Sequence, residues 1–229
     1  MNTRSRTAPP NSTSEPARLV SWLALVALLI AVAYASRAGA GKPSAQALYE
    51  WSTAVGAVVQ DAIVLAIVLA IAGFRRDLLA LRWPQSPGRT LLLLLAALVA
   101  IYVFEGLYSA LAHPGNEQGL TPSGWEPKHA AAYVVNGIVI CTWVPFVEEL
   151  TYRGVGYSLL ARYGRWAAIV LVGVLFGLSH GLVVSLPIIA IFGCVLAWVR
   201  AKTRSVLPGM ALHSSFNLVA LVAAVTIHR

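Results

Sequence analysis

Three short stretches of this sequence carry side chains that could do chemistry, and all three lie in or against strongly apolar segments. They are residues 148–153 (EELTYR), 176–180 (FGLSH) and 213–217 (HSSFN). A charge at the centre of a bilayer costs about 2.5–3.5 kcal/mol on insertion scales, so such residues persist there when they neutralise one another or take part in a reaction. A glutamate with two histidines and an asparagine can activate a water molecule and stabilise a tetrahedral intermediate.

The composition places these stretches in a membrane protein. The 229 residues are 58% hydrophobic and only 11% charged, and their mean hydropathy is +0.73. About 25% of the residues of a soluble domain are charged. Seven apolar runs could cross a hydrocarbon core of about 30 Å, and they cover residues 19–35, 54–74, 90–112, 130–149, 166–182, 183–199 and 206–227. The sequence therefore predicts an all-α, polytopic bundle of about seven transmembrane helices.

The basic residues predict how this bundle is oriented. Thirteen of the 17 lysines and arginines precede the first run or lie in the connections after the second, fourth and sixth runs. By the positive-inside rule, this alternation puts the N-terminus in the cytoplasm. The net charge of +8 is thus spread over loops and does not form a nucleic-acid-binding patch. Six of the seven tryptophans, Trp22 among them, fall near predicted span ends, where such rings anchor a helix at the interface.

Three regions are expected along the chain. Residues 1–17 are rich in proline, serine and threonine and should form a disordered cytoplasmic N-terminus. Residues 18–128 should form the N-terminal transmembrane helices, and residues 129–229, which contain all three polar stretches, the catalytic domain. The sequence contains no Walker loop and no dinucleotide-binding loop, so neither a nucleotide nor a nucleic acid is expected as a partner.

The acidic pair can meet the histidines only if the fourth helix extends beyond its apolar run. No proline interrupts residues 148–161, and the spacing of apolar residues predicts that the helix continues to about Arg162. At 1.5 Å per residue, Glu149 then lies about 18 Å from the cytoplasmic end of its helix. His180 and His213 lie about 21 Å and about 15 Å from the same surface. These similar depths allow three helices to bring their polar residues together.

The spacing within the stretches predicts different roles for the two acids. Glu149 precedes Arg153 by four residues, the favourable order for a salt bridge on a helix, so we assign this pair to structure. Glu148 points about 100° away, and we assign it as the general base that takes a proton from water. His213 and Asn217 are also four residues apart and share one helical face.

Each stretch also has a purely structural interpretation. The acids could form a paired charge cluster at a helix interface, and His180 could be a hydrogen-bonded packing residue on a helix whose glycines at 173, 177 and 181 admit a close neighbour. His213 and Asn217 could be an interhelical hydrogen-bond pair. The occurrence of all three stretches together favours a catalytic site.

These stretches resemble the motifs of a known family. Residues 145–154 (PFVEELTYRG) resemble the EExxxR motif of the CAAX prenyl protease and bacteriocin-processing (CPBP, Abi) family of intramembrane endopeptidases. Residues 174–180 (VLFGLSH) are similar to its FxxxH motif, and residues 207–217 (LPGMALHSSFN) to its HxxxN motif. The resemblance covers roughly residues 144–218, and the first half of the chain matches only as generic membrane helices.

The resemblance implies an α-helical membrane endopeptidase with a cavity open to the cytoplasm. Glu148 would activate water, His180 would assist it, and His213 with Asn217 would stabilise the oxyanion. Glu149, Arg153 and Phe176 would support the site. The substrate would be a membrane-associated peptide or a lipidated protein tail, and membrane lipids would surround the protein. The Ala-rich build suggests a bacterial protein of the inner membrane.

The metal and two rival functions stay open at this stage. Glu148, His180 and His213 could hold Zn²⁺ with an open fourth position, but they could also run a metal-free glutamate mechanism, which the lack of an HExxH pair favours. A non-catalytic immunity or scaffold relative could bind a peptide in the same cavity. A small transporter could use Asp61 and Glu105 with Glu148 as a proton path, although no inverted repeat supports this.

Overall fold

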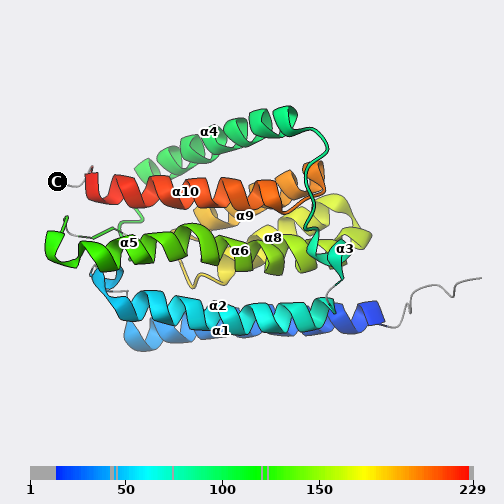
Figure 1. Cartoon of the computed structure of the whole chain (residues 1–229), viewed down its shortest axis with the longest axis horizontal. Coiled ribbons are helices and arrows are strands. Elements are labelled where there is room, and N and C mark those ends of the chain that lie inside the picture. The colour runs from blue at the N-terminus through cyan, green and yellow to red at the C-terminus, as the bar shows by residue number, and fades with distance from the viewer. Residues whose placement is uncertain are drawn as a thin grey trace, which may run out of the picture.

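A computed structural model describes residues 14–41, 44, 46–73, 75–119, 121, 122 and 124–226, and these residues contain helices but no β-strand. The chain begins with two long helices that lie side by side, α1 (Ser14–Ala40) and α2 (Trp51–Ala72) (Figure 1). Short helices η1 (Ala47–Tyr49) and α3 (Arg76–Leu79) flank α2, and α4 (Pro87–Ala112) follows. The expected all-helical, polytopic bundle is confirmed.

One continuous helix forms the centre of the bundle, from Pro127 to Tyr163. Its successive segments are η2 (Pro127–His129), α5 (Ala130–Ile138), η3 (Val139–Trp143), α6 (Val144–Glu148), η4 (Glu149–Gly156), α7 (Tyr157–Leu160) and η5 (Ala161–Tyr163). Segments η3 and η4 are π-helical, a rare geometry that is frequent at functional sites. The predicted continuation of this helix past the acidic pair to about Arg162 is thus confirmed, and we call the whole element the long helix.

The last three helices are α8 (Arg165–Leu178), α9 (Leu186–Thr203) and α10 (Leu207–Thr226). Six helices of the described chain are long and apolar enough to cross a membrane, whereas α8 has only 14 residues and spans about 21 Å. The predicted runs 166–182 and 183–199 therefore extended too far toward each other, because α8 ends at Leu178 and α9 begins only at Leu186. Gly181 has a φ of +64° in the turn that follows α8, and Pro187 lies at the start of α9, where its missing N–H costs nothing.

Glycines bring α8 and α9 into close contact, as their spacing predicted. A Cβ at Gly173 would lie 2.4 Å from Sγ of Cys194, and one at Gly177 would lie 2.9 Å from Cβ of Ala190. Across the interface, a Cβ at Gly193 would lie 2.8 Å from the carbonyl oxygen of Gly173. Because no side chain fits between these backbones, the hairpin holds the end of α8 close to the centre of the bundle.

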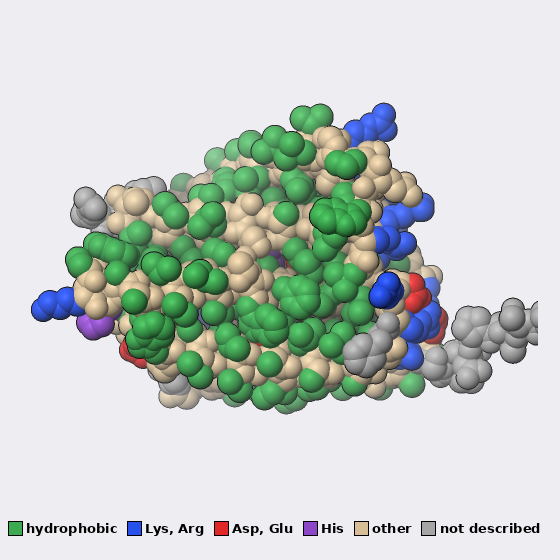
Figure 2. All heavy atoms as spheres, viewed as in Figure 1, with side chains coloured by type: hydrophobic (Ala, Val, Ile, Leu, Met, Phe, Trp, Pro, Cys, Tyr) green, Lys and Arg blue, Asp and Glu red, His purple; other side chains and the backbone are tan. Residues whose placement is uncertain are grey.

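The outer surface of the bundle is apolar along its flank and basic at one end. Hydrophobic side chains cover the flank in Figure 2, and Lys and Arg side chains gather mainly at the right-hand end. Leu92 is 68% exposed and Leu111 is 84% exposed, although both are long aliphatic side chains. A soluble protein would bury such a surface, so the chain is an integral membrane protein. Arg153, counted among the loop arginines from the sequence, instead lies inside the long helix and is fully buried.

The N-terminal region differs from expectation at two points. The predicted disorder of residues 1–17 falls mostly on residues 1–13, which lie outside the described residues, but α1 already begins at Ser14. Glu15 favours this start because an acid in the first turn complements the helix dipole, and its carboxylate lies 3.2 Å from Nη1 of Arg162. Trp22 is completely buried and does not anchor the interface, because its ring packs on Gly156 of the long helix.

Candidate active site

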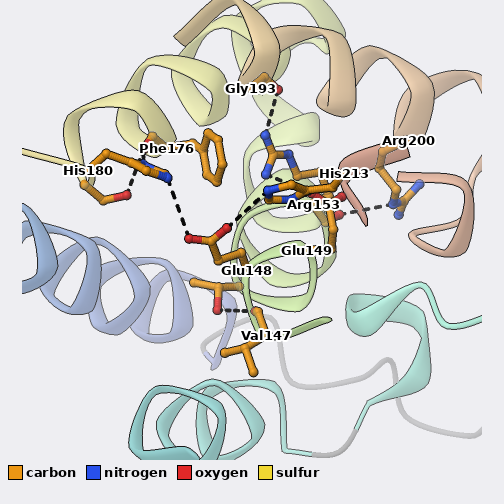
Figure 3. Close-up of polar contacts among 11 residues, drawn as sticks. Val147, Glu148, Glu149, Arg153, Phe176, His180, Gly193, Arg200 and His213 are labelled. Atoms are coloured by element: carbon orange, nitrogen blue, oxygen red, sulfur yellow. Dashed lines mark hydrogen bonds and ion pairs between the residues drawn. The ribbon is translucent and has the colours of Figure 1, made fainter. Parts of the chain in front are cut away.

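The three polar stretches meet near the middle of the bundle, around the carboxylate of Glu148 (Figure 3). Oε1 of Glu148 lies 3.9 Å from Nε2 of His180, and Oε2 lies 3.6 Å from Nε2 of His213. Glu148 ends α6, His180 follows the last turn of α8, and His213 lies in the second turn of α10. Their convergence depends on the long helix continuing past Glu148, which places this residue at the depth of the two histidines.

Glu149 and Arg153 form a buried ion pair beside this cluster. Nη1 of Arg153 lies 3.0 Å from Oε1 of Glu149, and neither side chain is exposed. Nη2 of Arg153 donates a hydrogen bond to the carbonyl oxygen of Gly193, and its guanidinium lies 4.2 Å from the centre of the Phe176 ring. The pair therefore ties the long helix to α8 and α9, and it has the geometry expected of a structural pair.

The two adjacent glutamates differ in their exposure. The side chain of Glu148 is 21% exposed and that of His180 is 24% exposed, whereas Glu149 is fully buried. His213 links the two acids, since its Nδ1 lies 3.5 Å from Oε1 of Glu149 while its Nε2 faces Glu148. Of the two carboxylates, Glu148 is thus the one that a water molecule or a substrate can reach.

A hydrogen bond to Phe176 orients His180. Nδ1 of His180 lies 2.8 Å from the carbonyl oxygen of Phe176. Because a carbonyl oxygen can only accept, Nδ1 carries the proton of this bond, and Nε2 is left to face Glu148. The Phe176 ring is completely buried and meets the ring of His180 edge-on, with 4.7 Å between the centroids. Phe176 therefore positions the histidine through both its backbone and its side chain.

Asn217 contacts a π-helical segment of the long helix. Its Nδ2 donates a 2.8 Å hydrogen bond to the carbonyl oxygen of Ile140, in η3. The carboxamide nitrogen has a second hydrogen, which remains available to a ligand. Two backbone carbonyl oxygens of η4 also accept hydrogen bonds from side chains. Nε1 of Trp22 donates to the carbonyl oxygen of Thr151, and Nε of Arg200 donates to that of Arg153. Side chains of α1, α9 and α10 thus support the unusual backbone on both sides of Glu148.

A pocket of about 240 Å³ connects these side chains. Glu148, His180, His213 and Asn217 all line it, together with apolar residues such as Phe192. We call it the catalytic pocket because the candidate catalytic residues line it. Gln118 also lines this pocket, and its neighbour Glu117 is ion-paired with Arg37 near the C-terminal end of α1. This is the end of the bundle opposite to most of the arginines. One part of the pocket wall therefore lies toward the less basic end of the bundle.

Gly209 is a site residue that the sequence reasoning did not single out. A Cβ on Gly209 would lie 2.4 Å from Oε2 of Glu149, so only glycine leaves room for this carboxylate against the start of α10. Gly209 lies within the stretch 207–217, directly after Pro208. A glycine inside the first turn of an apolar helix was the signal that could have identified it, because glycine lowers helix propensity and usually has a packing reason there.

The donors Glu148, His180 and His213 were the candidates for a zinc site. A structural or catalytic zinc needs three or four such side chains that converge on one point at about 2.0–2.3 Å. In the described part of the chain, no group of three or more His, Cys, Asp or Glu side chains is arranged in this way. As arranged here, these residues do not fit a metal ion.

The comparisons with known proteins agree with the motifs. Residues 130–219 match a family model described as "Rce1-like: Type II CAAX prenyl endopeptidase Rce1-like". This segment runs from the start of α5 into α10 and includes every polar residue of the cluster. Comparisons with curated proteins and with solved structures found no match.

Proposed function

Because residues 130–219 match the Rce1-like model of CAAX prenyl endopeptidases, we propose that this protein is an intramembrane endopeptidase. Its substrates would be membrane-associated peptides or C-terminal protein tails. The observation that carries the proposal is the position of Glu148, which is partly exposed in the catalytic pocket and has a histidine on each oxygen. The bundle would lie in a bacterial inner membrane with its basic end in the cytoplasm.

In the proposed reaction, Glu148 takes a proton from water as the water oxygen bonds to the peptide carbonyl carbon. His180, held by the Phe176 carbonyl, presents Nε2 to the same water. The negative charge that develops on the carbonyl oxygen is stabilised by His213 and by the second N–H of Asn217. Glu148 then returns the proton to the leaving nitrogen as the C–N bond breaks, which yields a carboxylic acid and an amine. The proposed steps use only side chains of the protein and a water molecule.

The transporter alternative would require Asp61, Glu105 and Glu148 to share one path. Asp61 and Glu148 do line a common cavity between α1, α2 and the long helix. Glu105 lines a different cavity, together with residues of α4, α9 and α10. Glu105 is therefore separated from the other two acids. A binding-only relative would not need Glu148 to be reachable by water. A peptidase is therefore the function that this arrangement of side chains supports best.

The two neighbouring glutamates provide the sharpest test. With a quenched peptide library, Glu148→Gln should abolish cleavage and leave the thermal midpoint in detergent unchanged, because Glu148 makes no close structural bond. Glu149→Gln should instead unfold at a lower temperature, because breaking a buried ion pair costs about 3–5 kcal/mol. Wild-type cleavage should also survive treatment with a chelator. Full activity of Glu148→Gln, or complete loss of activity with the chelator, would contradict the mechanism.

A further inference from the structure

A second cavity, of about 450 Å³, reaches Glu148 from the side of α1 and α2. We call it the α1–α2 cavity. Half of the residues that line it are aliphatic residues of these two helices, such as Leu28 and Ile63. Glu148 lines both this cavity and the catalytic pocket, and no other described residue lines both. In Figure 3, the faint blue ribbon of α1 lies below Glu148, whereas the two histidines lie above it.

Asp61 brings a buried acid to the α1–α2 cavity. Its side chain is only 8% exposed, and its Oδ2 has no hydrogen-bond partner among the described residues. Leaving a buried polar group unsatisfied costs about 1–3 kcal/mol, and more when the group is charged. Ordered water commonly satisfies such groups when the site is polar and roomy. Tyr152 and Ser179, which carry hydroxyl groups, also line this cavity, so it offers several polar partners.

The size of the α1–α2 cavity also suits water. At about 30 Å³ for each water molecule, it has room for on the order of ten. Each peptide-bond hydrolysis consumes one water molecule, and a peptide that fills the 240 Å³ catalytic pocket would displace water from that side of Glu148. Lipid surrounds the flank of the bundle and supplies none. A second cavity that reaches the carboxylate of Glu148 would supply water while a peptide occupies the catalytic pocket.

We propose that the α1–α2 cavity holds the water that hydrolysis consumes, and that Asp61 positions this water against Glu148. The inference rests on the proposed peptidase function. The water oxygen forms the new bond to the peptide carbonyl carbon, and its proton passes to Glu148 and then to the leaving nitrogen. Asp61 orients the water by a hydrogen bond and neither gains nor loses a proton over the cycle, so it is a positioning residue and not a catalytic one.

Steady-state kinetics of Asp61 variants test the positioning role. Asp61→Leu should lower kcat by about tenfold to hundredfold, the size of effect that a misplaced reactant produces, and should leave KM within about twofold. Asp61→Asn should restore most of kcat, because its amide still binds water. Glu105→Leu is the matched control, since it removes an acid of α4 that lines a different cavity, and it should keep wild-type kcat. Wild-type kcat in Asp61→Leu would overturn the proposal.

Thiol labelling tests the presence of water without reference to activity. In a protein with Cys141 and Cys194 replaced by alanine, Val64→Cys places a thiol on the wall of the α1–α2 cavity. It should react with a small charged methanethiosulfonate, whereas Val68→Cys, in the fully buried core of the same helix, should not. Adding Asp61→Leu should slow the labelling of Val64→Cys at least tenfold. Reaction with an apolar maleimide but not with the charged reagent would show that acyl chains fill the cavity, and would refute the inference.

The two proposals fail in distinguishable ways. If Glu148→Gln is inactive while Asp61→Leu turns over like the wild type, the peptidase mechanism stands and the water-supply role of Asp61 is wrong. If Glu148→Gln cleaves normally, the peptidase mechanism itself is wrong, and the water-supply role falls with it even where Val64→Cys is labelled. If Asp61→Leu does not fold, Asp61→Asn is compared with the wild type instead. A fall in its kcat of more than tenfold would contradict a role in which Asp61 binds water through a hydrogen bond.

Discussion

At the scale of residues, the site separates side chains that a substrate can reach from side chains that only hold the structure. Glu148 and His180 are partly exposed in the catalytic pocket, whereas Glu149 and Arg153 are completely buried and form an ion pair with each other. This separation explains how two adjacent acids can persist in a membrane helix. One is neutralised by an arginine, and the other keeps its lone pairs free for a reaction.

His213 and Asn217 are predicted to act as one unit on the developing oxyanion. They lie one helical turn apart and line the same pocket. Removing one donor from such a clamp typically lowers turnover by about 10²–10³-fold. Because both donors act on one charge, the double alanine variant should lose far less than the product of the two single losses. Single-turnover kinetics of His213→Ala, Asn217→Ala and the pair would measure this, with peptide binding assayed separately.

The binding measurement decides between two roles for this pair. A clamp acts on charge that is absent from the bound ground state, so peptide affinity should stay close to that of the wild type. Normal turnover combined with weak binding would instead show that His213 and Asn217 hold the substrate.

At the scale of elements, the close approach of α10 to the long helix is predicted to depend on Gly209. In Gly209→Ala, the new Cβ would clash with Oε2 of Glu149, so the buried ion pair must shift. Both the thermal midpoint and the cleavage rate should fall. Gly137→Ala is the matched control, because its Cβ would meet Leu221 at an ordinary 3.7 Å and alanine favours a helix interior by about 1 kcal/mol. Equal stability of the two variants would contradict this packing role.

A second element-scale contact joins two connections at the less basic end of the bundle. Glu117 accepts hydrogen bonds from the backbone N–H groups of Val183, Val184 and Ser185, and it pairs with Arg37 at 2.7 Å. Burial tends to raise the pKa of Glu117, but these backbone donors outweigh it and the pKa is lowered overall. A lowered pKa contributes stability that is complete above the ordinary glutamate pKa of about 4.3 and is lost as the pH falls through the folded-state pKa.

The Glu117 contact therefore predicts a specific acid sensitivity. In detergent at pH 7, the thermal midpoint of the wild type should lie above that of Glu117→Gln. The difference should shrink as the pH falls below about 4.3. A difference that stays constant down to pH 3 would show that the charge of Glu117 does not hold these connections together.

At the scale of the whole molecule, the alternating helices predict which connections share one side of the membrane. Ser86 precedes α4 and Lys128 is the second residue of the long helix, and both residues are exposed. In a background without Cys141 and Cys194, cysteines at these two positions should be labelled from opposite faces, Ser86→Cys from the cytoplasm. Labelling of both positions from the same side would refute the orientation.

The sequence alone was sufficient to predict the class of the protein and the course of its central helix. An apolar composition and seven runs of membrane-spanning length specify helices, because only helices or closed barrels satisfy the backbone within lipid. The continuation of the long helix to about Arg162 was predicted from the absence of proline and from the depth at which the acidic pair and His180 had to meet. The resemblance of the three motifs to one family was readable from the residues themselves.

Only the tertiary structure decided how these elements contact one another, because those contacts join residues that are far apart in the chain. Trp22 bonds to Thr151, 129 residues away, and no local pattern distinguishes this buried ring from an interfacial one. The turn after α8 packs against α1, since a Cβ at Gly181 would lie 2.9 Å from the carbonyl oxygen of Ala33. The role of Gly209 depends on the position of Glu149, and the sharing of a cavity by Asp61 and Glu148 depends on how α2 packs on the long helix. Periodicity indicates which face of a helix is apolar, but the packing of side chains on neighbouring helices determines which cavities remain between them.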